Sequence, residues 1–455
     1  MTDSDSTATA PVPAGATPEA IAGGVAEPDG SSWIARSGVV ALVVVGVAWA
    51  VVMVLILARP VFITHDSLSN NVHVWWIADQ LWSGAGVPMR IASLANGEAL
   101  TFPYASIPWL SAAVLWPALG DRAVSLWLVL GFAGTVGATF WTFPSLRRGW
   151  WAVATLTNPA LVISPMLGQL PFLWSIACFI TAMGMWRRGR VAWAVALTVV
   201  AQIIHPAVTI PIAGLAVLVW LPFERRERRV PLVGWWLVAV ALSAPAVWAV
   251  FQSPVVGQTS AATQLGALIQ TVAMRALVVA VPLGLVALQR QHVRRLPAWT
   301  PVALSVVFVV LQWPMYTPFG MDFGWGALRR NPDPSIDAYA ESSVQPGQTY
   351  RVLSGYDGKY GLYAVARAGG VLDAEFFPEG LHRGPFSSVH EYAAFLRERQ
   401  VDHVVTFPSY TRRYRMTNEP NLLEQMTALG CVDGVSVTRG PSSPEWSSFD
   451  VRTGC

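Results

Sequence analysis

The residues with the clearest chemical potential follow the first long apolar stretch of the chain. Asp66 stands a few residues past the end of that stretch, directly after His65. A carboxylate at the edge of a membrane is costly to place and usually marks a functional site. A reaction between a lipid-borne substrate and a soluble one would need its acid or base at this boundary. Asp66 is therefore the first candidate for catalysis, and capping of the helix that follows is its structural alternative.

The segment after Asp66 predicts a helix with two unlike faces. At helical spacing, Asn70 and His73 share the side of Asp66, whereas Leu68 and Val72 share the other side with several tryptophans. Such a helix is typical of a membrane interface, where tryptophan rings lie at the level of the lipid headgroups. We therefore expect it to lie on the membrane surface and to hold Asp66 between lipid and water.

Arg275 is the main candidate for binding an anion. It interrupts the apolar run 265–288, and a buried guanidinium must find a partner or a water-filled cavity. A lipid phosphate would serve, and the alternative is that the long side chain reaches the outer interface. His205 and Arg90 are further candidates, because both lie in or beside turns expected outside the membrane, where a solvated residue is the alternative.

The remaining candidates have less specific signals. His65 would orient Asp66 or contact a substrate, or would be a solvated loop residue. Asp79 would be a second polar contact on the same helix, although at 100° per residue it faces about 140° away from Asp66. Gln169 would line a cavity or satisfy a helix end.

The composition indicates an integral membrane protein. The hydrophobic fraction is 53% and the charged fraction 13%, against about 25% charged residues in soluble domains. Residues 1–36 are rich in small and polar residues and predict a disordered cytoplasmic tail, and residues 37–316 predict the transmembrane domain. Lysine and arginine exceed the acids by a formal charge of only +3, so their placement matters more than their number.

Four arginine clusters separate the later apolar segments and predict the topology. By the positive-inside rule all four face the cytoplasm, so the chain leaves and returns between them. The clusters are Arg147 and Arg148; Arg187, Arg188 and Arg190; Arg225, Arg226, Arg228 and Arg229; and Arg290, Arg294 and Arg295. The expected spans lie near 37–58, 123–143, 150–166, 171–186, 191–205, 207–222, 232–251, 268–289 and 299–316, about nine in all.

The apolar segment 103–119 has two interpretations. If it spans the membrane, the N-terminus lies outside; if it is a re-entrant or surface helix, the N-terminus is cytoplasmic. Its three prolines and Ser111 favour the second interpretation. Residues 59–122 then form one large external loop, and loops of this length are usually functional.

The polar remainder, 317–455, predicts an α/β domain outside the cell membrane. The expected strands are 350–354, 401–407, 434–438 and 447–451, the expected helices are 389–399 and 421–429, and 361–368 is a strand or a short helix. Cys431 and Cys455 both fall in this region and would pair if it is extracytoplasmic.

The order of these elements resembles the C-type glycosyltransferase superfamily of polytopic membrane enzymes. The matching segments are Thr64-His65-Asp66, the helix 67–82, Pro103-Tyr104, Gly120-Asp121-Arg122 and Asn158-Pro159. The segment 389–407 is similar to the C-terminal domains of bacterial YfhO-type membrane proteins. The acid-x-acid motif of some members is absent, because position 68 is Leu68, and this leaves metal dependence and the subfamily open.

The resemblance implies a transfer of a sugar from a polyprenyl-phosphate donor to a cell-envelope glycan, lipid or protein, on the outer face of the membrane. Asp66 would be the base, and His65, Asp79, Arg90, Tyr104, Gln169, His205 and Arg275 would contact the donor or substrate. The sequence shows no P-loop, dinucleotide fingerprint, zinc spacing or nucleophile elbow, so we expect no cofactor and no metal. Topology explains the basic loops, so we expect membrane lipids rather than nucleic acid as surroundings.

Two other functions stay open at this point. A transporter or translocase of a lipid-linked envelope intermediate would also use a buried arginine and proline-broken helices, although the sequence shows no internal inverted repeat. A non-catalytic membrane scaffold for envelope assembly would use the outer domain to bind its partners.

Overall fold

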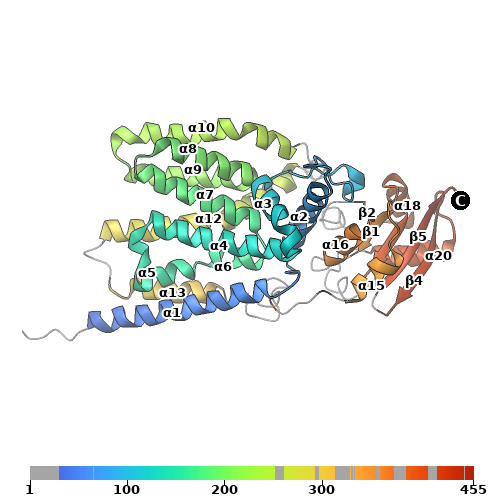
Figure 1. Cartoon of the computed structure of the whole chain (residues 1–455), viewed down its shortest axis with the longest axis horizontal. Helices are drawn as coiled ribbons and strands as arrows, with labels where there is room; N and C mark the ends of the chain where they lie inside the picture. The colour runs from blue at the N-terminus through green and yellow to red at the C-terminus, as the bar shows by residue number, and fades with distance from the viewer. Residues whose placement is uncertain are drawn as a thin grey trace, which may run out of the picture.

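A helical bundle and an α/β domain occupy opposite ends of an elongated molecule (Figure 1). The computed structural model describes residues 30–64, 66–251, 261–292, 297–312, 328, 332, 334–353, 359–373, 386–407, 418–444 and 446–455. Helix α2 (Ser67–Trp82) lies between the bundle and the α/β domain. The first turn after the bundle's opening helix is therefore close to both parts.

Six helices in the described part of the chain are long and apolar enough to cross a membrane, as the composition predicts for a membrane protein. They are α1 (Gly30–Leu57), α4 (Arg122–Thr142), α7 (Leu170–Arg187), α9 (Pro206–Trp220), α10 (Arg226–Phe251) and α12 (Ala261–His292). The apolar helices α8 (Val191–Ile204) and α13 (Thr300–Leu311) are shorter. The expected count of nine spans stays a prediction.

The segment 150–166, expected as one span, is two short helices, α5 (Gly149–Leu156) and α6 (Pro159–Met166). The break falls where proline cannot donate a backbone hydrogen bond within a continuing helix. Asn158 caps α6 by accepting a hydrogen bond from the backbone of Ala160 at 3.1 Å. Its amide also donates to the carbonyl of Leu277 in α12 at 3.0 Å, so the break connects two helices.

The apolar segment 103–119 forms α3 (Ser106–Leu119), a helix of 14 residues. Ala105 stands in the left-handed region at φ 58° and its N–H donates to the carbonyl of Ile204 at 2.8 Å. Trp109 is fully buried and belongs to the core of the bundle. Helix α3 is shorter than the roughly 20 residues that a bilayer requires. Whether α3 is re-entrant stays a prediction.

The apolar face of α2 packs against the C-terminal domain, and the expectation that it faces lipid was wrong for Leu68 and Val72. Both are 0% exposed and share one core cluster with Tyr350 and Tyr363 of that domain. Hydropathy alone does not distinguish burial against protein from burial against lipid, which explains the error.

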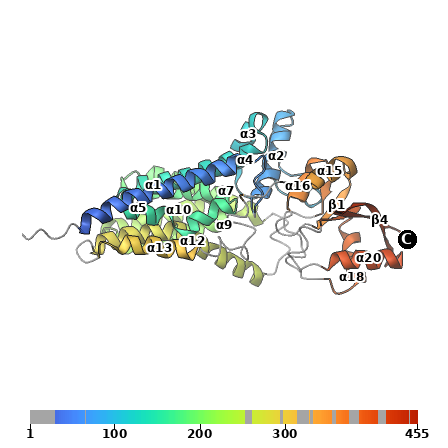
Figure 2. The same cartoon turned by 90° about the horizontal axis from the view of Figure 1, so that it is seen from below.

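The C-terminal domain is a five-stranded mixed sheet in the order β2-β1-β3-β5-β4. Its strands are β1 (Thr349–Leu353), β2 (Val371–Leu372), β3 (His403–Thr406), β4 (Val435–Ser443) and β5 (Trp446–Thr453). Helices α15 (Pro334–Ser343) and α16 (Lys359–Arg367) cover one face, and α18 (Val389–Glu398) and α20 (Glu419–Leu429) cover the other (Figure 2). The segment 361–368 is therefore helical. Cys431 and Cys455 form a disulfide.

A polar contact joins this domain to the turn before α4. The hydroxyl of Tyr363 donates to Asp121, and Arg367 pairs with the same carboxylate at 3.0 Å. Burial raises the pKa of Asp121, although the contacts with Tyr363 and Arg367 act in the opposite direction. Together with the shared core of α2, this contact fixes the domain against the bundle.

Candidate functional site

Two turns hold the backbone of Asp66 in place. Its N–H donates to the carbonyl of Leu167 at 2.8 Å, in the turn between α6 and α7. Its carbonyl accepts from the amide of Asn70 at 2.8 Å, and that amide also donates to the carbonyl of Gly168 at 3.0 Å. The side chain of Asp66 makes no capping hydrogen bond to α2, so helix capping does not account for this carboxylate.

Gly168 allows the two turns to approach closely. It stands at φ +72°, and a Cβ atom there would lie 2.7 Å from the backbone nitrogen of Ser67 and 2.9 Å from Cγ2 of Thr64. A larger residue would therefore have to shift the backbone that carries Asp66. The next residue, Gln169, begins the approach to α7, and its Oε1 is buried without a hydrogen-bond partner among the described residues.

The carboxylate of Asp66 pairs with the guanidinium of Arg275 from α12. Oδ2 lies 3.6 Å from Nη2, and 23% and 17% of the two side chains are exposed. The guanidinium also lies over the ring of Phe172, 5.4 Å from its centre, which adds a cation–π attraction. Arg275 thus has the anionic partner that a charge within an apolar helix requires, and both groups remain within reach of a ligand.

His205 is a second polar contact of Arg275. Its Nε2 lies 3.3 Å from Nη1 of the guanidinium. Because a guanidinium only donates, Nε2 accepts and the proton of the neutral imidazole is on Nδ1. Nδ1 is buried and has no hydrogen-bond partner among the described residues. Tyr104 stacks on this imidazole with ring centres 5.3 Å apart, so the turn between α8 and α9 holds the ring in place beside Arg275.

Trp109 of α3 connects this polar group to α2. Its Nε1 donates to Oδ1 of Asn70 at 2.8 Å, and its ring stacks on His73 with centres 4.0 Å apart. Tyr104 lies 5.1 Å from the same ring. The indole therefore packs beside both the residue that holds the Asp66 backbone and the ring that stacks on His205.

His73 is buried and uncharged near neutral pH. Its Nδ1 lies 2.9 Å from the carbonyl of Thr101, to which the protonated nitrogen donates. Burial lowers the pKa of His73 to about 4, although the hydrogen bond to Thr101 acts to raise it. His73 therefore fixes α2 against the first loop.

Two expected site residues do not join this group, and a third cannot be placed because it lies outside the described residues. Arg90 pairs with Glu98 at 2.8 Å in an exposed part of the first loop. Asp79 is exposed and accepts a hydrogen bond from Gln80 at 3.0 Å. His65 lies outside the described residues.

Sequence reasoning did not single out Trp109, Phe172 or Gly168 as site residues. Their contacts join segments that are far apart in the chain, and no local spacing indicates them. Gly168 alone carried a signal, since a glycine between two apolar segments is typical of a tight turn.

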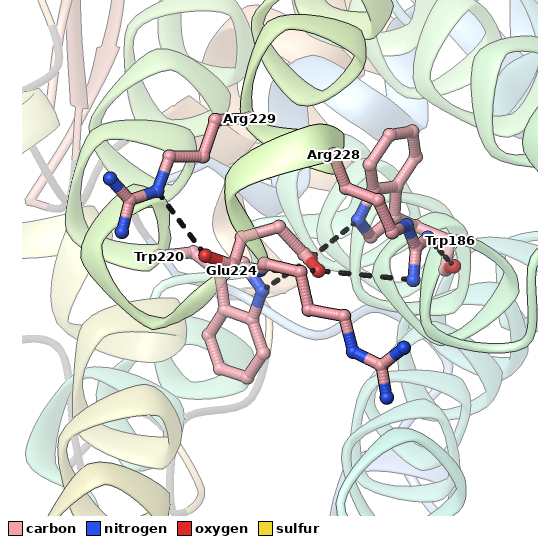
Figure 3. Close-up of polar contacts among 6 residues, drawn as sticks. Trp186, Trp220, Glu224, Arg228 and Arg229 are labelled. Carbon is pink, nitrogen blue, oxygen red and sulfur yellow. Dashed lines mark hydrogen bonds and ion pairs between the residues drawn. The ribbon is translucent and has the colours of Figure 1, made fainter.

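The arginine clusters at 147–148, 187–190 and 225–229 lie at the other end of the bundle from Asp66. Figure 3 shows Glu224 accepting from the indoles of Trp186 and Trp220, at 3.0 and 3.2 Å, with Arg228 3.8 Å away. The amide of Gln289 lies 3.5 Å from the carbonyl of Ser145, beside the first cluster. Arg275 is near the opposite end of the same candidate span, which runs from Val272 to Gln289.

The described residues contain no group of three or more His, Cys, Asp or Glu side chains arranged to hold a metal ion. The independence from metal that the sequence suggests stays a prediction.

No protein-family model matches the sequence, and no curated protein matches it. The structure is similar to the oligosaccharyltransferase of Archaeoglobus fulgidus, solved with zinc and sulfate, at 12% identity and a TM-score of 0.42 over 76% of this chain. This chain spans 65% of the length of that protein. It is also similar to ArnT from Cupriavidus metallidurans bound to undecaprenyl phosphate, at 13% identity and a TM-score of 0.43, over 92% of this chain and 98% of that one. At these scores the function has to be argued from the site itself.

Proposed function

We propose that this protein is a membrane glycosyltransferase that moves a sugar from a polyprenyl-phosphate donor to a cell-envelope acceptor. The observation that carries the proposal is the pair of Asp66 and Arg275, a carboxylate and a guanidinium 3.6 Å apart and both partly exposed. Transfer from a lipid phosphate needs a base for the acceptor hydroxyl and a cation for the departing phosphate. The pair supplies both at one end of the bundle.

The donor phosphate would displace Asp66 from Arg275. A phosphate offers a planar guanidinium several charged acceptor oxygens, and arginine binds such groups in a bidentate manner. Phe172 and His205 keep the guanidinium in position.

The carboxylate of Asp66, released from Arg275 and partly exposed, would then take the proton of the acceptor hydroxyl. The acceptor oxygen forms a bond to the anomeric carbon from the side opposite the phosphate. The bond between that carbon and the phosphate oxygen breaks, and its electron pair leaves with the phosphate. The configuration of the sugar inverts, and no metal takes part in this scheme.

The positive-inside rule supports placing the site on the outer face, because the three arginine clusters that the structure describes in full lie at the far end of the bundle. The external loop 59–122 and the domain 317–455 would then lie outside the cell membrane, with the N-terminus in the cytoplasm. A disulfide between Cys431 and Cys455 suits an oxidising compartment. The likeness of 389–407 to YfhO-type domains is part of the same proposal.

A translocase of a lipid-linked envelope intermediate is the second candidate. It is favoured by the same position of Arg275, since a guanidinium near the end of an apolar helix would guide a phosphate headgroup. A translocase has no need of a base beside that arginine, which makes transfer the better account of Asp66. A scaffold without chemistry accounts for neither residue.

Purified protein in liposomes, given a polyprenyl phosphate that carries a radiolabelled sugar and a crude envelope glycan fraction, tests the proposal. We expect label to move covalently to the acceptor, and Arg275→Gln to abolish the transfer while the matched surface variant Arg90→Gln retains it. Movement of the intact labelled lipid between leaflets without covalent transfer would favour the translocase. Absence of both activities from the wild-type protein would contradict the proposal.

A further inference from the structure

The C-terminal domain contains a polar groove that the proposed transfer does not use. Its volume is about 540 Å³, within the range of ligand sites in proteins. It is lined by α15 and the turn that follows it, by the start of β3 and by β5. The side chains that matter below are Tyr339, Gln345, Gln348, His403, Asp450 and Arg452.

The alternation of β5 places polar side chains on this face of the sheet. Ser448, Asp450 and Arg452 line the groove, whereas Phe449 belongs to the core under α18 and α20, and Val451 is part of that core but also borders the groove. Successive residues of a strand point to opposite faces, so every second residue of β5 faces the groove. A strand with one apolar and one polar face is common where the polar face is solvated. Here, however, residues of α15 and of the turn that follows it border that face.

Side chains of β3 and β5 lie in register on the floor of the groove, and a buried side chain of β1 supports them. Tyr350 of β1 is paired with His403 of β3, which is paired with Asp450 of β5. The imidazole stacks on Tyr350 with ring centres 4.8 Å apart, and its Nδ1 lies 2.9 Å from Oδ1 of Asp450. These contacts fix the ring, and its Nε2 has no partner in the described part of the chain.

The walls carry hydrogen-bonding groups that the protein itself does not use. The side-chain amides of Gln345 and Gln348, the hydroxyl of Tyr339 and the guanidinium of Arg452 make no hydrogen bond or ion pair with the described residues. Amides both donate and accept, a hydroxyl does both, and a guanidinium only donates. The groove therefore offers a ligand both hydrogen-bond donors and hydrogen-bond acceptors.

The charges in the groove are close to balanced. Asp402 already accepts from the backbone N–H of Thr349 at 2.8 Å, and Asp450 from His403. Arg452 is the one arginine or lysine among the lining residues, and two carboxylates oppose it. A phosphate or sulfate needs a local excess of positive charge, which this lining does not supply.

We propose that this groove binds a neutral oligosaccharide, separately from the site at Asp66. Each sugar hydroxyl both donates and accepts, which matches the mixed lining of side-chain amides, hydroxyls, carboxylates and one guanidinium. A peptide would instead be expected to extend the sheet along its edge strand β4 through backbone hydrogen bonds. The side-chain lining of the groove favours the glycan.

The test uses the full-length protein in nanodiscs with the substitution Asp66→Asn, so that binding is measured without turnover at the other site. The probes are neutral trisaccharides of mannose, glucose, galactose, arabinose and N-acetylglucosamine, a sulfated trisaccharide, and an uncharged hexapeptide. Saturation-transfer NMR and titration calorimetry give contact and affinity. Arg452→Ala and Gln348→Ala should each weaken binding about fivefold or more, as expected for the loss of one hydrogen bond. Arg439→Ala is the matched control, because Arg439 is an exposed arginine of β4 that pairs with Glu424 outside the groove.

Binding of at least one neutral trisaccharide that both groove variants weaken and the control does not would support the proposal. Binding of none of the neutral probes, tighter binding of the sulfated probe, or preference for the peptide would overturn it. Equal affinity of Arg452→Ala, Gln348→Ala and the control would overturn it as well, since the sugar would then lie elsewhere. A failure of transfer at Asp66 would leave these results unchanged, so the two proposals fail independently.

Discussion

Replacing Asp66 by Asn separates the two roles that the site gives to this carboxylate. As a base, Asp66 accelerates transfer; as the partner of Arg275, it competes with the donor phosphate for the guanidinium. The amide of Asn is nearly the same size and keeps the backbone contacts with Leu167 and Asn70, which do not involve the side chain. We therefore expect the protein to fold and insert normally.

The magnitudes follow from the geometry. At 3.6 Å and an effective dielectric constant of about 20, the Coulomb attraction between the two groups is on the order of 4 kcal/mol. Solvation of the partly exposed side chains cancels most of it, which leaves about 1 kcal/mol for the donor to overcome. Since 1.4 kcal/mol corresponds to a tenfold change in Kd, the donor should bind the Asp66→Asn variant about fivefold more tightly than the wild type. Loss of a general base should slow transfer about 10²- to 10⁴-fold.

The assay pairs displacement of a fluorescent polyprenyl phosphate, which gives donor affinity, with radiolabelled transfer at saturating donor. The matched control is Asp79→Asn, because Asp79 is an exposed carboxylate on the same helix whose hydrogen bond is to Gln80. The control should leave both quantities unchanged. Weaker donor binding by Asp66→Asn, or a turnover within tenfold of the wild type, would refute the reasoning.

Four further outcomes are expected. Gly168→Ala should reduce transfer without preventing insertion, because its Cβ would lie 2.7 Å from backbone; normal turnover would show that this turn does not position the base. Tyr363→Phe should destabilise the docking of the C-terminal domain by about 1–3 kcal/mol, since it removes a donor from the buried Asp121, and limited proteolysis would report the loosened domain. The pKa of His73 is about 4 in the folded protein and 6.5 in the unfolded chain. The contribution of neutral His73 to the free energy of unfolding is therefore complete above pH 6.5 and falls by about 3 kcal/mol as the pH drops to 4. Thermal unfolding of His73→Gln should lose part of that pH dependence, and an unchanged profile would contradict the assignment. A cysteine in place of Asn96 should react with an impermeant maleimide added outside intact cells; reaction only after permeabilisation would reverse the topology.

Local sequence patterns predicted the helices that carry the site residues. They did not predict which helices and turns pack against one another. The helix after Asp66 has the bounds Ser67–Trp82, because its apolar spacing and the preceding turn are both local. The need of Arg275 for a partner follows from the cost of burying its charge. The identity of that partner depends on the packing of α12 against the turn after α1, which no local pattern specifies.

The errors have the same origin. Leu68 and Val72 read as lipid-facing because hydropathy does not record what covers an apolar face, and the α/β domain covers them. The segment 150–166 was predicted as one span because it is apolar throughout. Pro159 indicates the break between the two helices. The segment 361–368 was ambiguous because short apolar runs suit either a strand or a helix.

A cryo-electron microscopy structure of the protein in nanodiscs with a polyprenyl phosphate tests the central claim most directly. We expect the phosphate within hydrogen-bond distance of Arg275, with the Asp66 carboxylate released toward the aqueous side of the site. A phosphate bound elsewhere, with the Asp66–Arg275 pair still closed, would contradict the account.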